Sequence, residues 1–166
     1  INKKIKIIDY KFDKYIVGIA LLPPPKQQDQ KQLPEQKPVD KDKINALVLV
    51  DDSDSKKMSK FELKDKLSAI IGNIAKDIDK NLTPQVVIIS ELWQNCYDAK
   101  YDILQLIALS APVFDRGMLA AIKIAEVHKT MVLKKFEKYI VSYVLFGSLT
   151  RGEATERSDV DIAIII

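Results

Sequence analysis

Residues 146–166 read FGSLTRGEATERSDVDIAIII, a polar segment enclosed by two apolar stretches. The order is an apolar strand predicted over 141–146, then Gly-Ser, ten further residues, Asp-Val-Asp, and a second strand predicted over 160–166. Side chains alternate between the two faces of a strand, so Asp159 and Asp161 are predicted to share one face. Two carboxylates about 6–7 Å apart along a strand supply the oxygen ligands that Mg²⁺ prefers. The segment therefore predicts a metal site.

The Gly-Ser turn and a short helix predicted over 148–155 complement these carboxylates. Gly147 lets a triphosphate approach the backbone closely, and Ser148 offers a hydroxyl and an N–H at a helix N-terminus, where anions are favoured. Arg151 lies one turn into that helix, within reach of a phosphate oxygen. Phosphoryl-type transfer needs this combination, because positioning and charge neutralisation do most of the work.

At these residues the chain resembles the nucleotidyltransferase superfamily that includes DNA polymerase β, especially its small prokaryotic members, the minimal nucleotidyltransferases. Their pattern of an apolar strand, Gly-Ser, ten residues and Asp-x-Asp recurs here from Gly147 to Asp161. The resemblance implies that Asp159 and Asp161 bind two magnesium ions. It also implies that Ser148 and Arg151, beside Gly147, contact the phosphates of a nucleoside triphosphate, with ATP the expected one.

A structural interpretation of the same residues stands beside the functional one. The Gly-Ser pair is compatible with an ordinary turn, and Asp-x-Asp with a solvated strand edge. Asp161 argues against this, because it stands between Val160 and a long apolar run, where a carboxylate costs several kcal/mol unless it is paired or metal-bound. Glu153 and Glu156 are interpreted as solvated helix residues.

An internal repeat organises the rest of the chain. The stretch KFDKYIV at 11–17 matches KFEKYIV at 135–141, at an offset of 124 residues, and an apolar strand follows each copy. The next strand also recurs, because ALVLV at 46–50 aligns with IAIII at 162–166 at an offset of 116. The first copy therefore has about eight more residues between its two strands, and these lie in a Pro/Gln-rich loop predicted over 23–43.

The first copy lacks every catalytic feature of the second. Pro23 and Pro24 stand where Gly-Ser is expected, and Lys43 and Asn45 align with the two aspartates. Proline removes an N–H donor, and protonated lysine binds no metal. Gln85 or a neighbouring valine replaces the acid expected on the third strand. We therefore expect a degenerate nucleotidyltransferase-like module at 1–117, and a linker helix with the start of an active-type domain at 118–166.

The resemblance also implies a third carboxylate on a later strand. The second copy stops before that strand, so the active copy is expected to be incomplete. The chain begins without methionine and stops inside an apolar run, and we interpret it as a fragment of a longer protein.

Apolar periodicity predicts the remaining elements and the fold class. Strands are expected over 15–22, 44–50, 86–89 and 113–114, and helices over 100–109 and 118–139. Ser59 and Glu62 form a capping-box pattern that opens a further helix, predicted to run to about 81. Together these predict an α/β (α+β) architecture, a mixed sheet flanked by helices.

Composition limits the partners and the compartment. The net charge is +3, which tolerates an anionic ligand and mildly disfavours long nucleic acid. No apolar run approaches the roughly 18 residues that span a bilayer, so no membrane partner is expected. Cys96 is the single cysteine, which favours a reducing cytoplasm. A homo-oligomer is compatible with the sequence.

Other chemically suggestive residues are interpreted as structural. His128 is expected on a helix surface rather than as a ligand, and the acidic turn at 51–54 is expected to be solvated. Trp93, Tyr97 and Tyr101 fit a core or an interface better than a platform for stacked bases, and Cys96 fits a part-buried free thiol.

The sequence thus predicts a metal-dependent nucleotidyltransferase that moves a nucleoside monophosphate to a hydroxyl acceptor, a protein among the candidates, with release of pyrophosphate. The alternative is a catalytically silent module that acts through protein interaction, for example in a toxin–antitoxin pair. A carboxylate from the first module, such as Asp51 or Glu91, lying beside Asp159 and Asp161 would favour a composite site.

Overall fold

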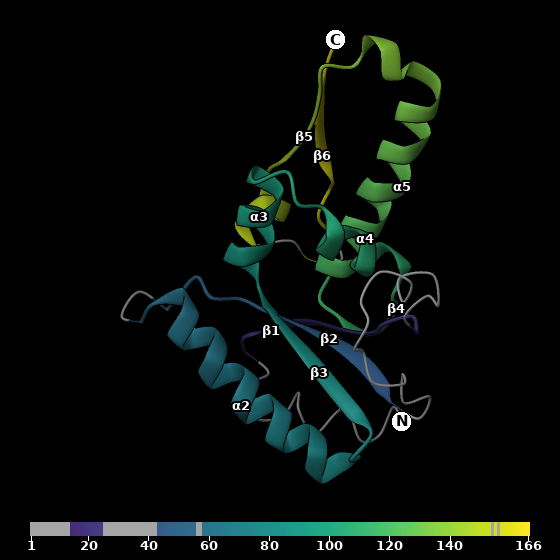
Figure 1. Cartoon of the computed structure of the whole chain (residues 1–166). Helices are drawn as coiled ribbons and strands as arrows, with labels where there is room; N and C mark the ends of the chain where they lie inside the picture. Colours follow the sequence, from purple (N-terminus) through teal and green to yellow (C-terminus); the bar gives the residue numbers. More distant parts are fainter. Residues whose placement is uncertain (1–13, 25–42, 56–57, 154, 156) are drawn as a thin grey trace, which may run out of the picture.

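The structure, a computed structural model, describes residues 14–24, 43–55, 58–153, 155 and 157–166 (Figure 1). Its strands are β1 (Ile16–Leu21), β2 (Ile44–Val50), β3 (Leu82–Ile88), β4 (Ala111–Asp115), β5 (Ser142–Phe146) and β6 (Asp161–Ile165). Its helices are α2 (Lys60–Ile78), α3 (Ile89–Tyr97), α4 (Asp102–Leu109), α5 (Met118–Phe136) and α6 (Ser148–Arg151), with a 3₁₀ turn, η2 (Glu137–Tyr139), after α5. Most of the Pro/Gln-rich loop predicted over 23–43, and residues 11–13 of the repeat, lie outside the described residues.

The first sheet is mixed, in the order β3-β2-β1-β4. Strand β1 is antiparallel to both β2 and β4, whereas β2 and β3 are parallel and are joined through α2. Pro84 lies within β3, and it is tolerated because β3 forms the edge of the sheet. The predicted architecture, a mixed sheet flanked by helices, is confirmed.

The two faces of this sheet are buried under different helices (Figure 1). On one face, side chains of β1, β2 and β3 pack around Ile71 of α2. On the other face, residues such as Leu47 and Leu49 pack with side chains of α3, α4 and α5. Burial on both faces explains why 46–50 is a continuous apolar run rather than an alternating one.

Helix α2 begins where the capping pattern placed it. The Ser59 hydroxyl accepts a hydrogen bond from the Glu62 N–H at 3.2 Å, and the helix ends at Ile78, three residues earlier than predicted. The Glu62 carboxylate pairs with Lys66 at 2.8 Å, one turn further along the same helix.

Helix α3 was not predicted, and the third strand was placed incorrectly. Strand β3 begins at Leu82, and Ile89, which the sequence assigned to the strand, is the first residue of α3. The Asp52 carboxylate accepts a hydrogen bond from the Ser90 N–H at 3.0 Å and so satisfies a donor in the first turn of α3. This contact joins residues 38 positions apart, so local periodicity could not reveal it.

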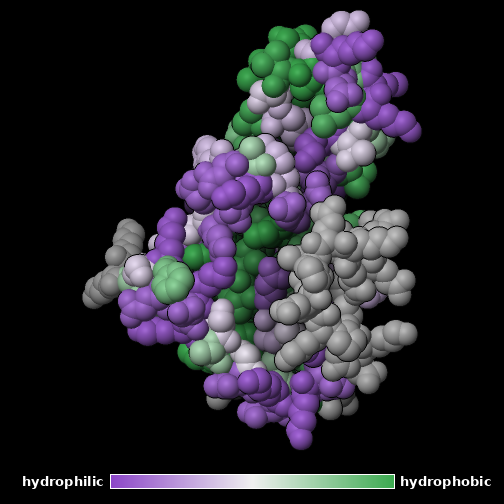
Figure 2. All heavy atoms as spheres, in the orientation of Figure 1, coloured by the Kyte–Doolittle hydropathy of each residue, from purple (hydrophilic) through white to green (hydrophobic). Residues whose placement is uncertain are grey.

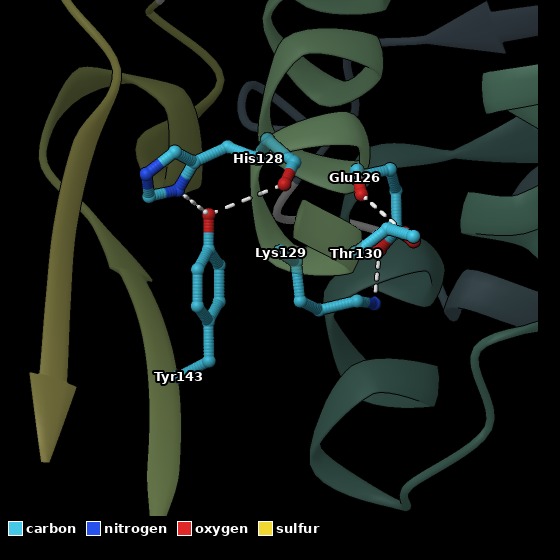
Figure 3. Close-up of polar contacts among 6 residues, drawn as sticks. Glu126, His128, Lys129, Thr130 and Tyr143 are labelled. Atoms are coloured by element: carbon cyan, nitrogen blue, oxygen red, sulfur yellow. Dashed lines mark hydrogen bonds and ion pairs between the residues drawn. The ribbon is translucent and has the colours of Figure 1, made fainter. Parts of the chain in front are cut away.

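Helix α5 extends from the first sheet to a second, two-stranded sheet made of β5 and β6, called the C-terminal hairpin below (Figure 1). The first half of α5, including Leu119 and Ile122, is buried against the first sheet. Further along, the Tyr143 hydroxyl donates to the Ala125 carbonyl at 3.2 Å and lies 3.0 Å from Nδ1 of His128 (Figure 3). The second half of the helix therefore holds the hairpin at its side (Figure 1).

The two antiparallel strand pairs share one register. In the first sheet Gly18 pairs with Leu49, and the next three pairs continue to Leu21 with Ala46. In the hairpin Ser142 pairs with Ile165, and the next three pairs continue to Leu145 with Ile162. Ser142 is thus equivalent to Gly18, and Ile165 to Leu49. The strand pairing repeats the sequence offsets of 124 and 116 through four successive pairs.

One face of the hairpin is apolar and exposed. The exposed hydrophobic side chains on this face are Val144, Phe146 and Ile165. Figure 2 shows a hydrophobic surface at the end of the molecule where the C-terminus lies. No helix within the described part of the chain is long and apolar enough to cross a membrane.

Candidate active site

The turn between β5 and α6 brings Gly147 against Asp161. Gly147 has a φ of 78°, and a Cβ added there would lie 2.0 Å from Oδ2 of Asp161. Any larger residue would meet the carboxylate, so only glycine fits this position. Asp161 is the first residue of β6, pairs with Phe146 and is partly buried. The hairpin thus places one predicted metal ligand directly on the predicted phosphate-binding turn.

Asp159 is placed differently from Asp161. It is exposed and precedes the first residue of β6 by two positions, so the predicted strand over 160–166 begins one residue late, at Asp161. A compact turn leads into it: the Ser158 N–H donates to the Thr155 carbonyl at 3.0 Å, and the Thr155 N–H donates to the Ser158 hydroxyl at 2.9 Å. The backbone before Asp159 is therefore held by local hydrogen bonds rather than by the sheet.

Helix α6 is one turn long and ends at Arg151, whereas the sequence predicted a helix to about 155. Gly152 ends it with a φ of 77°, and the Glu153 N–H donates to the Ser148 carbonyl at 3.0 Å. Ser148 is partly exposed at the start of this turn.

Arg151 points into solvent and pairs with a neighbour. Its Nε donates to Glu153 at 2.8 Å, and both side chains are more than half exposed. An exposed ion pair of this kind contributes about 0–1 kcal/mol, so little free energy holds Arg151 to Glu153. Glu153 is thus solvated, as the sequence suggested, while Glu156 lies outside the described residues.

A cavity of about 310 Å³ opens beside the segment that leads to the two aspartates. It is formed between the junction of β4 with α5 and the turn at 155–160. Its lining residues are Asp115, Gly117, Ala120, Ala121, Ile124, Thr155, Ser158 and Val160. The Asp115 carboxylate in its wall already accepts hydrogen bonds from the N–H groups of Gly117 and Leu119, both at 3.0 Å.

No third acid joins the aspartates within the described residues, where no group of three or more His, Cys, Asp or Glu side chains is able to hold a metal ion. The acids that the sequence offered for a composite site are engaged elsewhere. Glu91 pairs with Lys64 at 2.6 Å, and Asp51 accepts from the Ser53 N–H at 2.9 Å. The hypothesis of a composite site is not supported by this part of the chain.

At the corresponding end of the β1–β2 pair, the described residues that align with the motif include no acid. Leu22 donates its N–H to the Asn45 carbonyl at 2.9 Å, in the place where Phe146 faces Asp161 in the hairpin. Pro23 and Lys43 are exposed there, and Gln85 is exposed on β3. These aligned positions carry amide and ammonium groups in place of the two carboxylates.

The remaining residues singled out by sequence have structural roles. His128 is exposed on α5, and Cys96 is a partly buried free thiol whose pKa is raised by burial. Asp54 pairs with Lys14 at 3.4 Å on the surface. Lys129 forms an ion pair with Glu126 (Figure 3) and lies over the ring of Tyr101.

Sequence reasoning missed two residues that shape the site. Leu149 is 0% exposed, in the core under the first sheet, although it follows Ser148 directly. Tyr143 bonds to α5 and fixes the strand that delivers Gly147. An apolar residue at 149 was visible in the sequence, but the core that it joins is built from residues of β1 to β3 and of α3 to α5, all far from it in the chain.

Comparison with known proteins bears on the same segment. Residues 126–166 match the family model described as a nucleotidyltransferase domain. The match covers the second half of α5 and the whole hairpin, and it supports the nucleotidyltransferase superfamily and a transferase function in general terms. No curated protein and no solved structure matches this chain.

Proposed function

We propose that this chain carries the nucleotide- and metal-binding part of a magnesium-dependent nucleotidyltransferase. The reaction moves a nucleoside monophosphate from a nucleoside triphosphate, ATP, to a hydroxyl acceptor. The observation that carries the proposal is the contact of Asp161 with Gly147, because it joins a carboxylate to a backbone turn that only glycine permits. The family match over 126–166 supports the same assignment.

The residues present fit magnesium in part. Asp159 and Asp161 offer the hard oxygen ligands that it requires, and Asp161 is held in place by its strand. When bound, magnesium neutralises charge that develops on the phosphates. A two-ion site takes a further carboxylate, which the described residues do not supply.

The chain's own groups bind and orient the triphosphate. The Gly147–Ser148 turn receives the β- and γ-phosphates through backbone N–H groups and the Ser148 hydroxyl, and Arg151 exchanges Glu153 for a phosphate oxygen. The acceptor oxygen forms a bond to the α-phosphorus, and the bond to the bridging oxygen breaks. Pyrophosphate leaves with that electron pair, and the acceptor proton passes to solvent.

We propose further that residues 1–117 form a degenerate copy of the same module and that 118–166 begin the active one. The shared register of the two antiparallel pairs supports the duplication, because the two offsets came from sequence and recur in the strand pairing. In the first sheet β1 is antiparallel to β2, and β2 is parallel to β3, although the motif is missing there. The acceptor in the proposed reaction is a hydroxyl. The net charge of +3 disfavours long nucleic acid as a partner, and the lone Cys96 suits a reducing cytoplasm.

The competing proposal is a silent module that acts by protein interaction. One observation favours it: among the described residues no third acid accompanies Asp159 and Asp161. Binding of magnesium-ATP separates the two proposals, because a silent module has no need to retain it.

The test is calorimetric titration of magnesium-ATP into the full chain and into the Asp159→Asn, Asp161→Asn double variant. We expect magnesium-dependent binding by the unaltered protein and its loss in the variant. The matched control is Asp65→Asn, Asp77→Asn, which removes two exposed charges from α2 and leaves the hairpin intact. Equal binding by all three proteins, or by none, would show that the motif is a relic.

A further inference from the structure

The helix that carries Ser148 is anchored in the core of the first sheet. Leu149 is completely buried, and it belongs to the cluster that contains Leu47 and Leu49 of β2 and side chains of α3, α4 and α5. Its own sheet, by contrast, leaves Phe146 and Ile165 about half exposed, at 48% and 51%. The predicted phosphate-binding turn is therefore fixed from the module that lacks the motif.

The other end of α6 lies close to α3. A Cβ added to Gly152 would lie 3.1 Å from Cδ1 of Ile89, the first residue of α3. Ile89 is itself held, because the Asp52 carboxylate bonds to the next N–H, that of Ser90. The position of Gly152 is thus tied through α3 to the end of β2.

We infer that Ile89 and Leu149 are positioning residues that set the Gly147–Ser148 turn for the nucleotide, so that the motif-free module acts as the scaffold of the active turn. Ser148 lies one residue from Leu149, and close-packed interiors transmit small displacements rather than absorb them. A binding turn loses affinity when its supporting contacts are displaced by about an ångström. The inference rests on the proposed function and adds to it the residues that position the site.

The contact between Gly152 and Ile89 allows a test by a double-mutant cycle in the full chain. Gly152→Ala introduces a methyl group against Ile89 and an alanine at positive φ, and we expect magnesium-ATP affinity to fall about tenfold. Ile89→Val removes Cδ1, the atom at 3.1 Å, while the strain of alanine at positive φ remains, so we expect it to recover about threefold of the affinity that Gly152→Ala loses. A Leu149→Ala variant is avoided because emptying a core site compromises folding itself.

The control and the second readout separate positioning from general stability. Gly72→Ala changes a glycine of α2 that has no atom within 4 Å of an added Cβ, and its affinity should equal that of the unaltered protein. Amide hydrogen exchange at 148–151 should accelerate in Gly152→Ala and slow again in the double variant. Unchanged affinity in Gly152→Ala, or a loss that Ile89→Val leaves untouched, would overturn the inference.

Failure of the proposed function gives a different pattern. In that case the unaltered protein itself binds no magnesium-ATP, while exchange at 148–151 still reports on the anchoring. If Ile89→Val then slows the exchange that Gly152→Ala accelerates, the packing of α6 on α3 stands without the nucleotide site. If it does not, the packing is overturned as well.

Discussion

The antiparallel pairs β1–β2 and β5–β6 have one register and opposite surroundings. Leu49 of the first pair is completely buried, whereas Ile165, its equivalent by register, is 51% exposed. Ala20 is completely buried, and its equivalent Val144 is 38% exposed. The register therefore does not depend on what covers the strands.

The ends of the two pairs differ in chemistry rather than in geometry. In the hairpin, Gly147 leaves room for the Asp161 carboxylate. At the equivalent place in the first sheet, the Asn45 carbonyl accepts a hydrogen bond from the Leu22 N–H. Pro23 follows Leu22 where Gly147 follows Phe146, and proline has no N–H. The register of the two pairs is thus the same with the motif at the end and without it.

The largest expected effect tests the difference in burial. Leu49→Ala should lower the free energy of unfolding by about 3 kcal/mol, because it empties a core site that helices close off. Ile165→Ala, at the equivalent position, should cost about 1 kcal/mol or less, because half of that side chain already contacts water. Urea denaturation of both variants measures the contrast. Equal losses would mean that Ile165 is buried in solution by a further contact.

The next prediction concerns the turn that distinguishes the two pairs. Gly147→Ala should cost about 2 kcal/mol of unfolding free energy, because the new methyl group meets Oδ2 of Asp161 and φ is positive. Magnesium-ATP affinity should fall by at least about tenfold as the carboxylate is pushed away. Calorimetry and urea denaturation measure the two effects. As control, Gly72→Ala in α2 should raise stability by about 0.5–1 kcal/mol, since helix propensity improves without a clash.

Elements specified by local sequence were predicted well. Strand β2 occupies 44–50 as expected, because an apolar β-branched run between turn-forming residues leaves few alternatives. Ser59 caps α2 as its spacing with Glu62 indicates. Helix α3 was missed because a donor in its first turn, the Ser90 N–H, is satisfied by Asp52, a residue 38 positions earlier that folding brings alongside.

The candidate site likewise contains residues that local sequence predicted and residues that it did not. The spacing of Gly147 and Asp161 predicted two residues that the hairpin brings into contact. No local pattern indicated that Leu149 would be buried against a different sheet, because that depends on how the hairpin docks. Asp159 lies outside the strand that was expected to carry it, since the Thr155–Ser158 turn delays the start of β6.

A smaller effect is expected at Tyr143, which occupies the position of Ile19 in the first pair by register. Ile19 is buried in apolar surroundings under α2, whereas Tyr143 reaches α5 through two hydrogen bonds. Tyr143→Phe should cost about 1 kcal/mol, because the Ala125 carbonyl loses its donor and the ring packing remains. His128→Ala removes only the outer hydrogen bond and should cost less. Thermal unfolding of both variants checks the order, and a larger loss in His128→Ala would contradict it.

The smallest effect concerns alkaline pH at the same residue. Burial, and then the nearby Glu126 carboxylate, raise the pKa of Tyr143 above its ordinary value of 10.0. Above that pH the unfolded chain loses the phenol proton while the folded protein retains it. The contribution of Tyr143 is therefore complete below pH 10 and declines as pH rises through the folded pKa. Ile19 has no titrating group, so the first pair makes no such contribution. The difference in unfolding free energy between the unaltered protein and Tyr143→Phe should be constant from pH 7 to about 9.5 and then narrow. A difference that widens above that range would mean that the phenolate is favoured in the folded protein, and that the contact with α5 is weaker than the geometry indicates.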